Sequence, residues 1–140
     1  MIVEVAASIG AVAIAEWNAL TEGNPFLRHE FRSALHETGC AAPKSGWAPQ
    51  YVLLRENGRL AGAMPLYLKA HSYGEYVFDW SWADAYRRHG QRYYPKLLAA
   101  IPFTPASGPR LLAGSRPLRQ RLLDAALALL GEERLSSLHI

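Results

Sequence analysis

The dipeptide Asn57-Gly58 constrains the fold of this 140-residue chain more than any other feature, because it is the strongest short signal for a β-hairpin. One apolar run, residues 51–54, precedes it, and a longer run, residues 59–69, follows it. Pro65 interrupts the second run, and a proline has no amide hydrogen to donate to a neighbouring strand. We therefore predict two antiparallel strands whose regular pairing breaks near Pro65.

Along the rest of the chain, segments whose apolar residues have helical spacing alternate with segments typical of strands. The clearest helix is expected between Ser115, its cap, and Gly131, and Asn24-Pro25 are expected to cap an earlier one. Helices are predicted at residues 8–20, 24–38, 82–89 and 115–130, and extended segments at residues 2–5, 71–79, 96–103, 110–113 and 135–140. The pattern indicates an α/β (α+β) fold with a mixed sheet flanked by helices.

The composition fits one globular domain, residues 1–140. Half of the residues are apolar, and the mean hydropathy is near zero at −0.06. The longest apolar runs fall short of the roughly 20 residues that cross a bilayer, so we expect no membrane span. Glu4 stands where a signal peptide would carry a basic residue, and the single Cys40 has no partner for a disulfide. We therefore predict a cytoplasmic location and assign Cys40 no role.

The charge pattern argues against several classes of protein. The net charge is +3, but the basic residues are dispersed and only Arg87-Arg88 are adjacent, so we expect no nucleic-acid interface. The five histidines are scattered and no cysteine pair exists, so we expect no metal site. No motif for a catalytic serine elbow, a zinc protease or a nucleotide phosphate loop is present, and we expect no tightly bound cofactor.

Residues 71–86 combine aromatic side chains with carboxylates and are the most unusual stretch of the chain. Aromatic walls with a few fixed acids suit a polar or cationic small molecule. Glu75 and Asp79 are four residues apart, and either could accept a proton from an ammonium group. These two residues are the predicted catalytic groups, and the predicted substrate-binding residues are Tyr73, Trp80, Trp82 and Asp84. An aromatic core strand followed by a helix capped by Asp79 or Ser81 is the alternative interpretation.

Residues 102–109 contain three prolines and form a stiff turn between apolar runs. This rigidity fits a loop that lines a ligand site and fits a plain connector equally well.

Five segments resemble a bacterial family of predicted N-acyltransferases related to the GNAT superfamily and to the FemAB peptidoglycan enzymes. They are residues 24–31 (NPFLxHEF), 62–69 (GAMPLYLK), 71–80 (HSYGEYVFDW), 93–98 (YYPKLL) and 102–105 (PFTP). The family has been labelled for peptidoglycan biosynthesis or recognition, and its members are longer than this chain. The resemblance implies that residues 1–140 are an N-terminal GNAT-like, FemAB-like domain of a longer protein, with a splayed sheet that is incomplete at the C-terminus.

The resemblance also implies a donor. In GNAT enzymes acyl-CoA inserts between splayed strands and its phosphates meet a loop of the form Arg/Gln-x-x-Gly-x-Gly/Ala. The resemblance therefore implies acyl-CoA as the first expected co-substrate. No such string stands between Lys96 and Leu118, and this departure from the GNAT pattern leaves aminoacyl-tRNA, the FemAB donor, as the second.

Together with residues 71–86, the resemblance implies an N-acyltransferase that moves an acyl group from an acyl-CoA or aminoacyl donor to the primary amine of a small molecule or peptide, without a covalent enzyme intermediate. A noncatalytic module that recognises a cell-wall fragment or peptide on the same aromatic segment is the alternative. We also expect the chain to self-associate, because an unfinished sheet exposes an unpaired edge.

Overall fold

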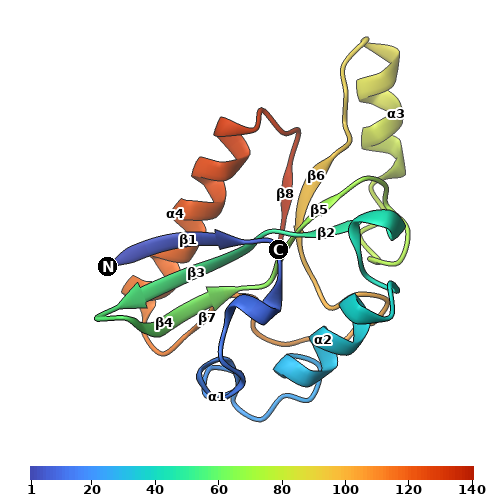
Figure 1. Cartoon of the computed structure of the whole chain (residues 1–140). Helices are drawn as coiled ribbons and strands as arrows, with labels where there is room; N and C mark the ends of the chain where they lie inside the picture. The colour runs from blue at the N-terminus through green and yellow to red at the C-terminus, as the bar shows by residue number, and fades with distance from the viewer.

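The computed structural model describes residues 1–140 as helices packed on two four-stranded sheets (Figure 1). The strands are β1 (Ile2–Ala6), β2 (Trp47–Pro49), β3 (Tyr51–Glu56), β4 (Arg59–Met64), β5 (Leu66–Lys69), β6 (Lys96–Ala99), β7 (Leu112–Ala113) and β8 (Leu138–His139). The helices are α1 (Ile14–Asn18), α2 (His29–Glu37), α3 (Trp80–Arg88) and α4 (Arg116–Glu132), with short 3₁₀ turns at Ile9–Ala11 and Pro43–Ser45. The α/β class predicted from the sequence is confirmed.

The predicted hairpin is present. Strands β3 and β4 pair antiparallel around Asn57 and Gly58, whose φ angles of 50° and 80° fit a tight turn of this kind. Regular pairing breaks at Pro65, which separates β4 from β5, as the sequence predicted. The first strand is interrupted at the same level by Gln50, whose amide donates to the Leu66 carbonyl at 2.8 Å. A single long hairpin is thus bent into two halves.

The two halves of the hairpin belong to different sheets. One sheet has the order β1-β3-β4-β7 and the other the order β2-β5-β6-β8. Strand β7 pairs with β4 and strand β6 pairs with β5, but β6 and β7 do not pair with each other. This split of a mixed sheet is consistent with the GNAT-like fold that the resemblance implied.

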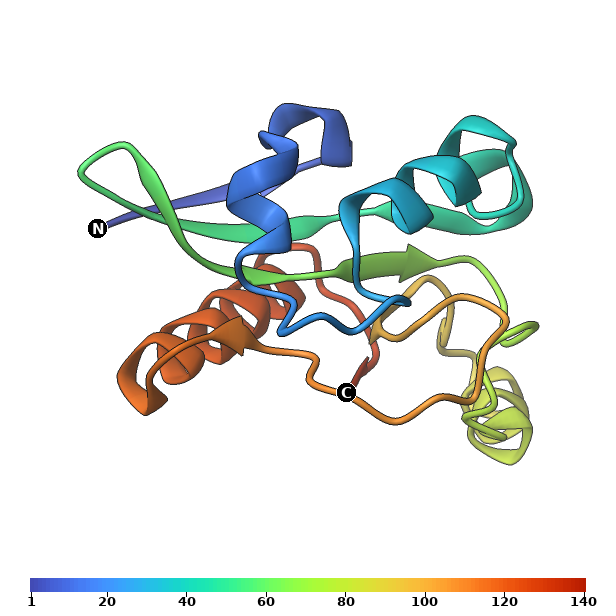
Figure 2. The ribbon, with the colours of Figure 1, turned by 90° about the horizontal axis from the view of Figure 1, so that it is seen from below.

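Helices cover both faces of the sheets, as Figure 2 shows, with α1 and α2 on one side and α4 on the other. Successive residues of β3 point to opposite faces of the sheet. Tyr51 and Leu53 belong to the core cluster that contains Trp17, under α1 and α2. Val52 and Leu54 belong to the other cluster, with Leu122 of α4. Nearly continuous apolar strands are therefore explained by burial on both faces.

Helix α4 matches its prediction. The Ser115 side chain accepts a hydrogen bond from the Leu118 amide at 3.4 Å, and Leu122 and Ala126 are fully buried. Its apolar spacing and its cap are both local features, which explains why the sequence placed it well.

Two other helices differ from their predictions. The Asn24 side chain accepts a hydrogen bond from the Phe26 amide in a local turn, and α2 begins only at His29. The His29 amide is bound by the side chain of Asn18 at 2.9 Å, so a residue from α1 supplies the cap. The segment predicted as one helix over residues 8–20 is a 3₁₀ turn followed by the short helix α1.

The segment at residues 71–79 is an irregular loop, so the predicted extended conformation is wrong. Tyr76 and Phe78 have φ angles of 58° and 57°, in the left-handed region that non-glycine residues rarely adopt, and both side chains are exposed. Asp79 occupies the N-cap position of α3, but its side chain makes no capping hydrogen bond. The alternative interpretation of Asp79 as a helix cap is therefore not supported by its contacts.

Candidate functional site

Two lysines lie at the ends of β5 and β6, the two central strands of their sheet. Lys69 ends β5, Lys96 begins β6, and the two residues are directly opposite each other in the antiparallel pairing. Both side chains are fully buried beneath the loop at residues 70–79. Lysines are almost never buried without a partner, so this arrangement requires negative charge nearby.

Lys96 binds both of the predicted catalytic carboxylates. Its Nζ contacts Glu75 Oε1 and Asp79 Oδ2, the second at 2.5 Å, and donates to Ser72 Oγ at 3.2 Å. The carboxylates come from the loop, while Lys96 comes from the strand below it. The structure therefore brings Glu75 and Asp79 together, although the loop is not extended as the sequence predicted.

Lys69 has a different set of contacts. Its Nζ donates to the Tyr73 carbonyl at 3.0 Å, lies 3.9 Å from the centre of the Trp47 ring and lies 3.8 Å from Glu75 Oε2. Burial lowers the pKa of Lys69 to about 8, and the positive charge of Lys96 acts in the same direction against the attraction of Glu75. Near neutral pH this amine is closer to losing its proton than an exposed lysine.

The pKa values of the two carboxyl groups are shifted in opposite directions. Burial raises the pKa of Glu75 despite the neighbouring lysines, and its Oε2 atom has no hydrogen-bond partner. Burial also opposes ionisation of Asp79, but hydrogen bonds from Lys96 and Tyr93 outweigh it and lower the pKa of Asp79 to about 2. Glu75 is therefore the better proton acceptor of the pair, and Asp79 is a fixed negative charge.

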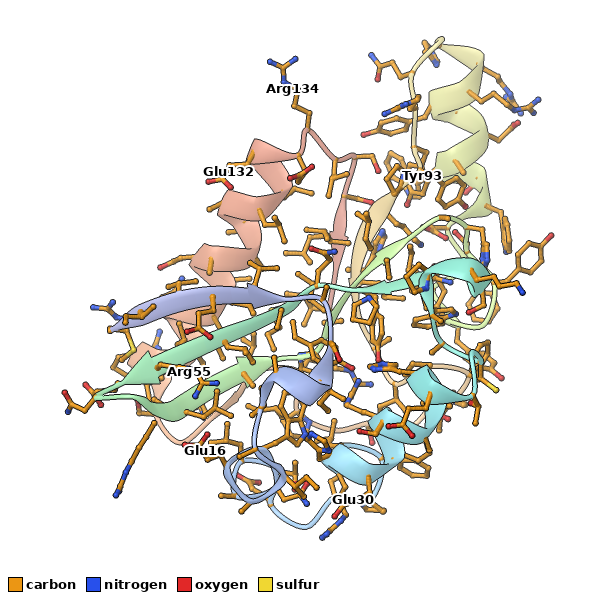
Figure 3. The ribbon with its side chains drawn as sticks, in the orientation of Figure 1. Glu16, Glu30, Arg55, Tyr93, Glu132 and Arg134 are labelled. Carbon is orange, nitrogen blue, oxygen red and sulfur yellow. The ribbon has the colours of Figure 1, made fainter.

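Tyr93 and His139 complete the cluster on the side of Asp79. The Tyr93 hydroxyl donates to Asp79 Oδ2 at 2.5 Å, and His139 Nε2 lies 3.2 Å from that hydroxyl. Burial and the nearby Lys96 lower the pKa of His139. Tyr93 is itself buried, and Figure 3 shows it between α3 and the strands.

An aromatic hollow of about 250 Å³ lies over the buried charges. Tyr73 and Trp80 form one wall, with ring centroids 4.9 Å apart, and 68% and 45% of their respective surfaces are exposed. Tyr76 and Phe78 also line the hollow. The Glu75 side chain itself is fully enclosed, so its carboxylate lies behind the hollow and not on its surface.

Two predicted binding residues lie elsewhere. Trp82 is 66% exposed and does not line the aromatic hollow. The Asp84 carboxylate pairs with Arg87 at 2.5 Å and with Arg88, both on its own helix, and lines a separate hollow beside Tyr93 and Tyr94. Of the four predicted wall residues, only Tyr73 and Trp80 therefore lie next to Glu75.

The lysines are the residues that the sequence interpretation missed. Lys69 alternates with Leu68 and Leu66 and thus shares a face with the buried Tyr67, which was a detectable signal. Lys96 stands at the head of a fully apolar run. A lysine on the buried side of a predicted strand indicates a hidden carboxylate partner, and that rule would have found both.

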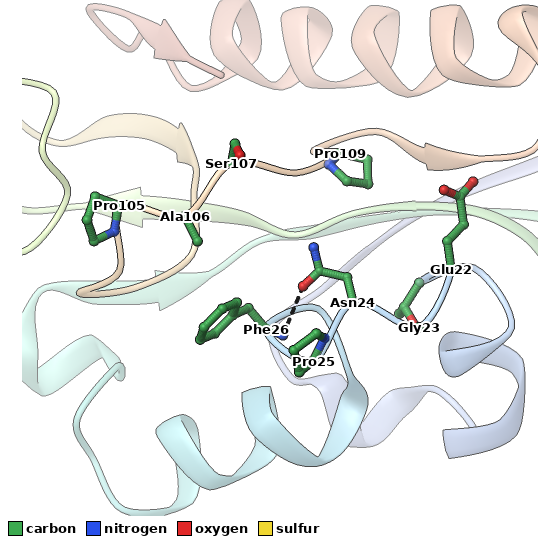
Figure 4. A pocket seen from close by; sticks show the side chains of 10 residues that line it. Glu22, Gly23, Asn24, Pro25, Phe26, Pro105, Ala106, Ser107 and Pro109 are labelled. Carbon is green, nitrogen blue, oxygen red and sulfur yellow. Dashed lines mark hydrogen bonds between the residues drawn. The ribbon is translucent and has the colours of Figure 1, made fainter.

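A second, larger hollow of about 660 Å³ lies on another side of the domain (Figure 4). Residues 21–26 form one wall, and residues of the loop at 105–109 form the other. The walls approach closely at Asn24, since a Cβ atom added to Gly108 would lie 2.9 Å from Asn24 Nδ2. The proline-rich loop therefore lines a hollow, and its role as the wall of a ligand site stays a prediction.

A split mixed sheet with helices on both faces, and a charged cluster under an aromatic loop, define an α/β domain of GNAT-like architecture. The sequence model of the FemAB-like family, described as peptidoglycan biosynthesis/recognition, matches residues 8–140, so the chain belongs to that family. Comparisons with curated proteins and with solved structures find no match. The family implies a transferase or recognition role connected with peptidoglycan. None of the helices is both long and apolar enough to cross a membrane.

Proposed function

We propose that this domain contributes to the transfer of an acyl or aminoacyl group to the primary amine of a peptidoglycan-type peptide. The observation that carries the proposal is the cluster of Lys69, Lys96, Glu75 and Asp79 directly behind an aromatic hollow. Clusters of buried titratable groups next to a hollow occur preferentially at functional sites.

The hollow suits the acceptor. Tyr73 and Trp80 line the hollow with aromatic rings, which attract an ammonium group at their faces, and the carboxylate of Glu75 lies on the inner side. A peptide amine held by the rings is therefore drawn toward Glu75, the cluster carboxylate that adjoins the hollow and whose Oε2 atom accepts no hydrogen bond.

In the proposed reaction the amine nitrogen attacks the donor carbonyl, a C–N bond forms and the C–S or C–O bond of the donor breaks. Glu75 accepts the proton that the amine loses, and the departing thiol or hydroxyl group takes up a proton in turn. Asp79 holds Lys96 in place, and Lys96 with Lys69 supplies positive charge for the developing oxyanion. Acyl-CoA and aminoacyl-tRNA are both candidate donors.

The enclosed carboxylate requires that the loop at residues 70–79 moves when substrate binds. Tyr76 and Phe78 have left-handed backbone conformations that cost about 1–3 kcal/mol each, and such strain is common in segments that rearrange. Recognition of a cell-wall peptide without transfer is the second candidate function, and it is favoured by the same enclosure of Glu75 and by the exposed rings around it.

The test measures transfer by the full-length protein from acetyl-CoA, longer acyl-CoAs and aminoacyl-tRNA to an amine-bearing muropeptide. Glu75→Gln should lower kcat about 10²-fold or more with little change in muropeptide affinity, because it removes a proton acceptor and keeps the shape. Glu37→Gln, at an exposed position on α2, is the matched control and should keep full activity. Binding of the muropeptide without transfer from any donor would favour the recognition role.

A further inference from the structure

The hollow beside Asp84, Tyr93 and Tyr94, which we call the arginine hollow, has a volume of about 450 Å³. Its walls come from helix α3 and from residues 91–94, shortly after the end of that helix. Trp80, which is 45% exposed, lines both this hollow and the aromatic hollow. The two hollows therefore meet at one side chain, and a single ligand can reach both.

Two tyrosines connect the arginine hollow with the buried lysine cluster. Tyr93 and Tyr94 line the hollow, and the Tyr93 hydroxyl donates to Asp79 Oδ2 at 2.5 Å. The Tyr94 hydroxyl lies 2.5 Å from Ser72 Oγ, which accepts a hydrogen bond from Lys96. Both hydroxyl groups are thus held by residues of the candidate site, so this wall of the arginine hollow has a fixed position relative to that site.

The charged residues of the arginine hollow leave an excess of positive charge. Arg87, Arg92 and Asp84 are its only charged lining residues. Asp84 pairs with Arg87 and with Arg88 on its own helix, so its negative charge is already matched. Arg92 is exposed and forms no ion pair with any residue of the chain. Its guanidinium group is therefore free to bind an anion.

The two hollows differ in the charge that they attract. Glu75 is the only charged residue that lines the aromatic hollow, whose rings also favour an ammonium group. The arginine hollow favours an anion, and the planar guanidinium group of an arginine presents paired donors that match a carboxylate. A ligand with an ammonium group at one end and a carboxylate at the other therefore fits both hollows at once. A peptide acceptor has both groups.

We propose that Arg92 binds a carboxylate of the acceptor peptide in the arginine hollow while the acceptor amine lies in the aromatic hollow. The identity of the ligand rests on the proposed function, whereas the positive charge of the hollow does not. Trp80 borders both hollows, so it contacts the part of the peptide that joins the two bound groups. Arg92 holds the far end of the acceptor and touches no reacting atom. It therefore selects acceptors that carry a carboxylate close to their amine.

Isothermal titration calorimetry of the full-length protein at low ionic strength tests the proposal with the tripeptide Nα-acetyl-Lys-Ala-Ala. Four forms of this probe combine a free or acetylated ε-amine with a free or amidated C-terminal carboxylate. The wild-type protein should bind the free-carboxylate forms roughly 5-fold or more tightly than the amidated forms, because the amide lacks the negative charge. Arg92→Gln should lose this preference. Arg59→Gln, which removes an exposed charge on the hairpin, is the matched control and should keep it.

The four probes separate this proposal from the proposed function. Equal affinity for the acid and the amide, with weaker binding of the acetylated-amine forms, would support the acceptor hollow and overturn the role of Arg92. A carboxylate preference that survives in Arg92→Gln, or a wild-type protein that binds no form of the probe, would overturn that role as well. A preference that depends on Arg92, without any effect of amine acetylation, would support the arginine hollow as a carboxylate site and contradict the proposed acceptor site.

Discussion

Lys69 and Lys96 are direct cross-strand neighbours in the pairing of β5 and β6, and both are fully buried. Like charges at opposite positions of a sheet destabilise it, so the pair depends on the carboxylates of the overlying loop. Glu75 reaches both lysines, with Oε1 on Lys96 and Oε2 on Lys69. The loop is thus attached to the sheet by charge, which links the stability of the fold to the candidate site.

Removal of Lys96 should therefore destabilise the whole domain. Lys96→Met leaves Glu75 and Asp79 buried without their main partner, and we expect the free energy of unfolding to fall by about 3–5 kcal/mol. Urea unfolding measures this loss. Lys44→Met, at an exposed position, is the control and should change stability little, and equal stability of the two variants would show that the cluster is not structural.

The pH dependence of stability should reveal Lys69. The pKa of Lys69 is lowered from 10.5 to about 8 in the folded chain, so above pH 8 the folded state has released a proton that the unfolded state still holds. The free energy of unfolding should consequently rise between pH 8 and about 9.5, below the range in which exposed tyrosines ionise. Chemical unfolding at each pH should show this rise in the wild type and in Lys44→Met, and its loss in Lys69→Met. Identical slopes in all three would contradict the assignment.

The hairpin turn should be sensitive to a side chain at Gly58. The φ angle of 80° there is one that β-branched residues resist, while no atom lies within 4 Å of the position of an added Cβ. Gly58→Val should therefore cost on the order of 1 kcal/mol or more through the backbone alone. Gly114, which also has open space but no positive φ, supplies the control, and Gly114→Val should lower the melting temperature clearly less.

Self-association is expected at the free edge of β1. Ile2, Val3 and Val5 are each about half exposed or more, and Val3 and Val5 line a groove against α4. Val3→Lys combined with Val5→Lys should shift the sedimentation of the protein toward monomer at high concentration. Arg55 forms ion pairs with Glu4 of β1 at 3.1 Å and with Glu16 of α1 at 3.5 Å, so the double variant should stay folded. Figure 3 labels Arg55 and Glu16. A wild-type protein that sediments as a monomer at all concentrations would refute the expectation.

The amino-acid sequence alone determined the elements whose signals are local. The turn at Asn57-Gly58, the break at Pro65 and the capped helix α4 each depend on residues within a few positions of one another. The sequence also singled out Glu75 and Asp79 as unusual acids and Tyr73 and Trp80 as their aromatic neighbours. Backbone preferences and side-chain spacing both act between residues that are close in sequence, so these elements can be predicted without knowledge of the tertiary structure.

Only the tertiary structure decided the start of α2, the course of the loop over residues 70–79 and the partners of the buried charges. The cap of α2 comes from Asn18, and the charge that holds Glu75 comes from Lys96, 21 residues further along the chain. Burial makes these contacts compulsory, because a charge removed from water is stable only beside an opposite one. Which opposite charge is near depends on how strands distant in sequence pair, and no local pattern records that pairing.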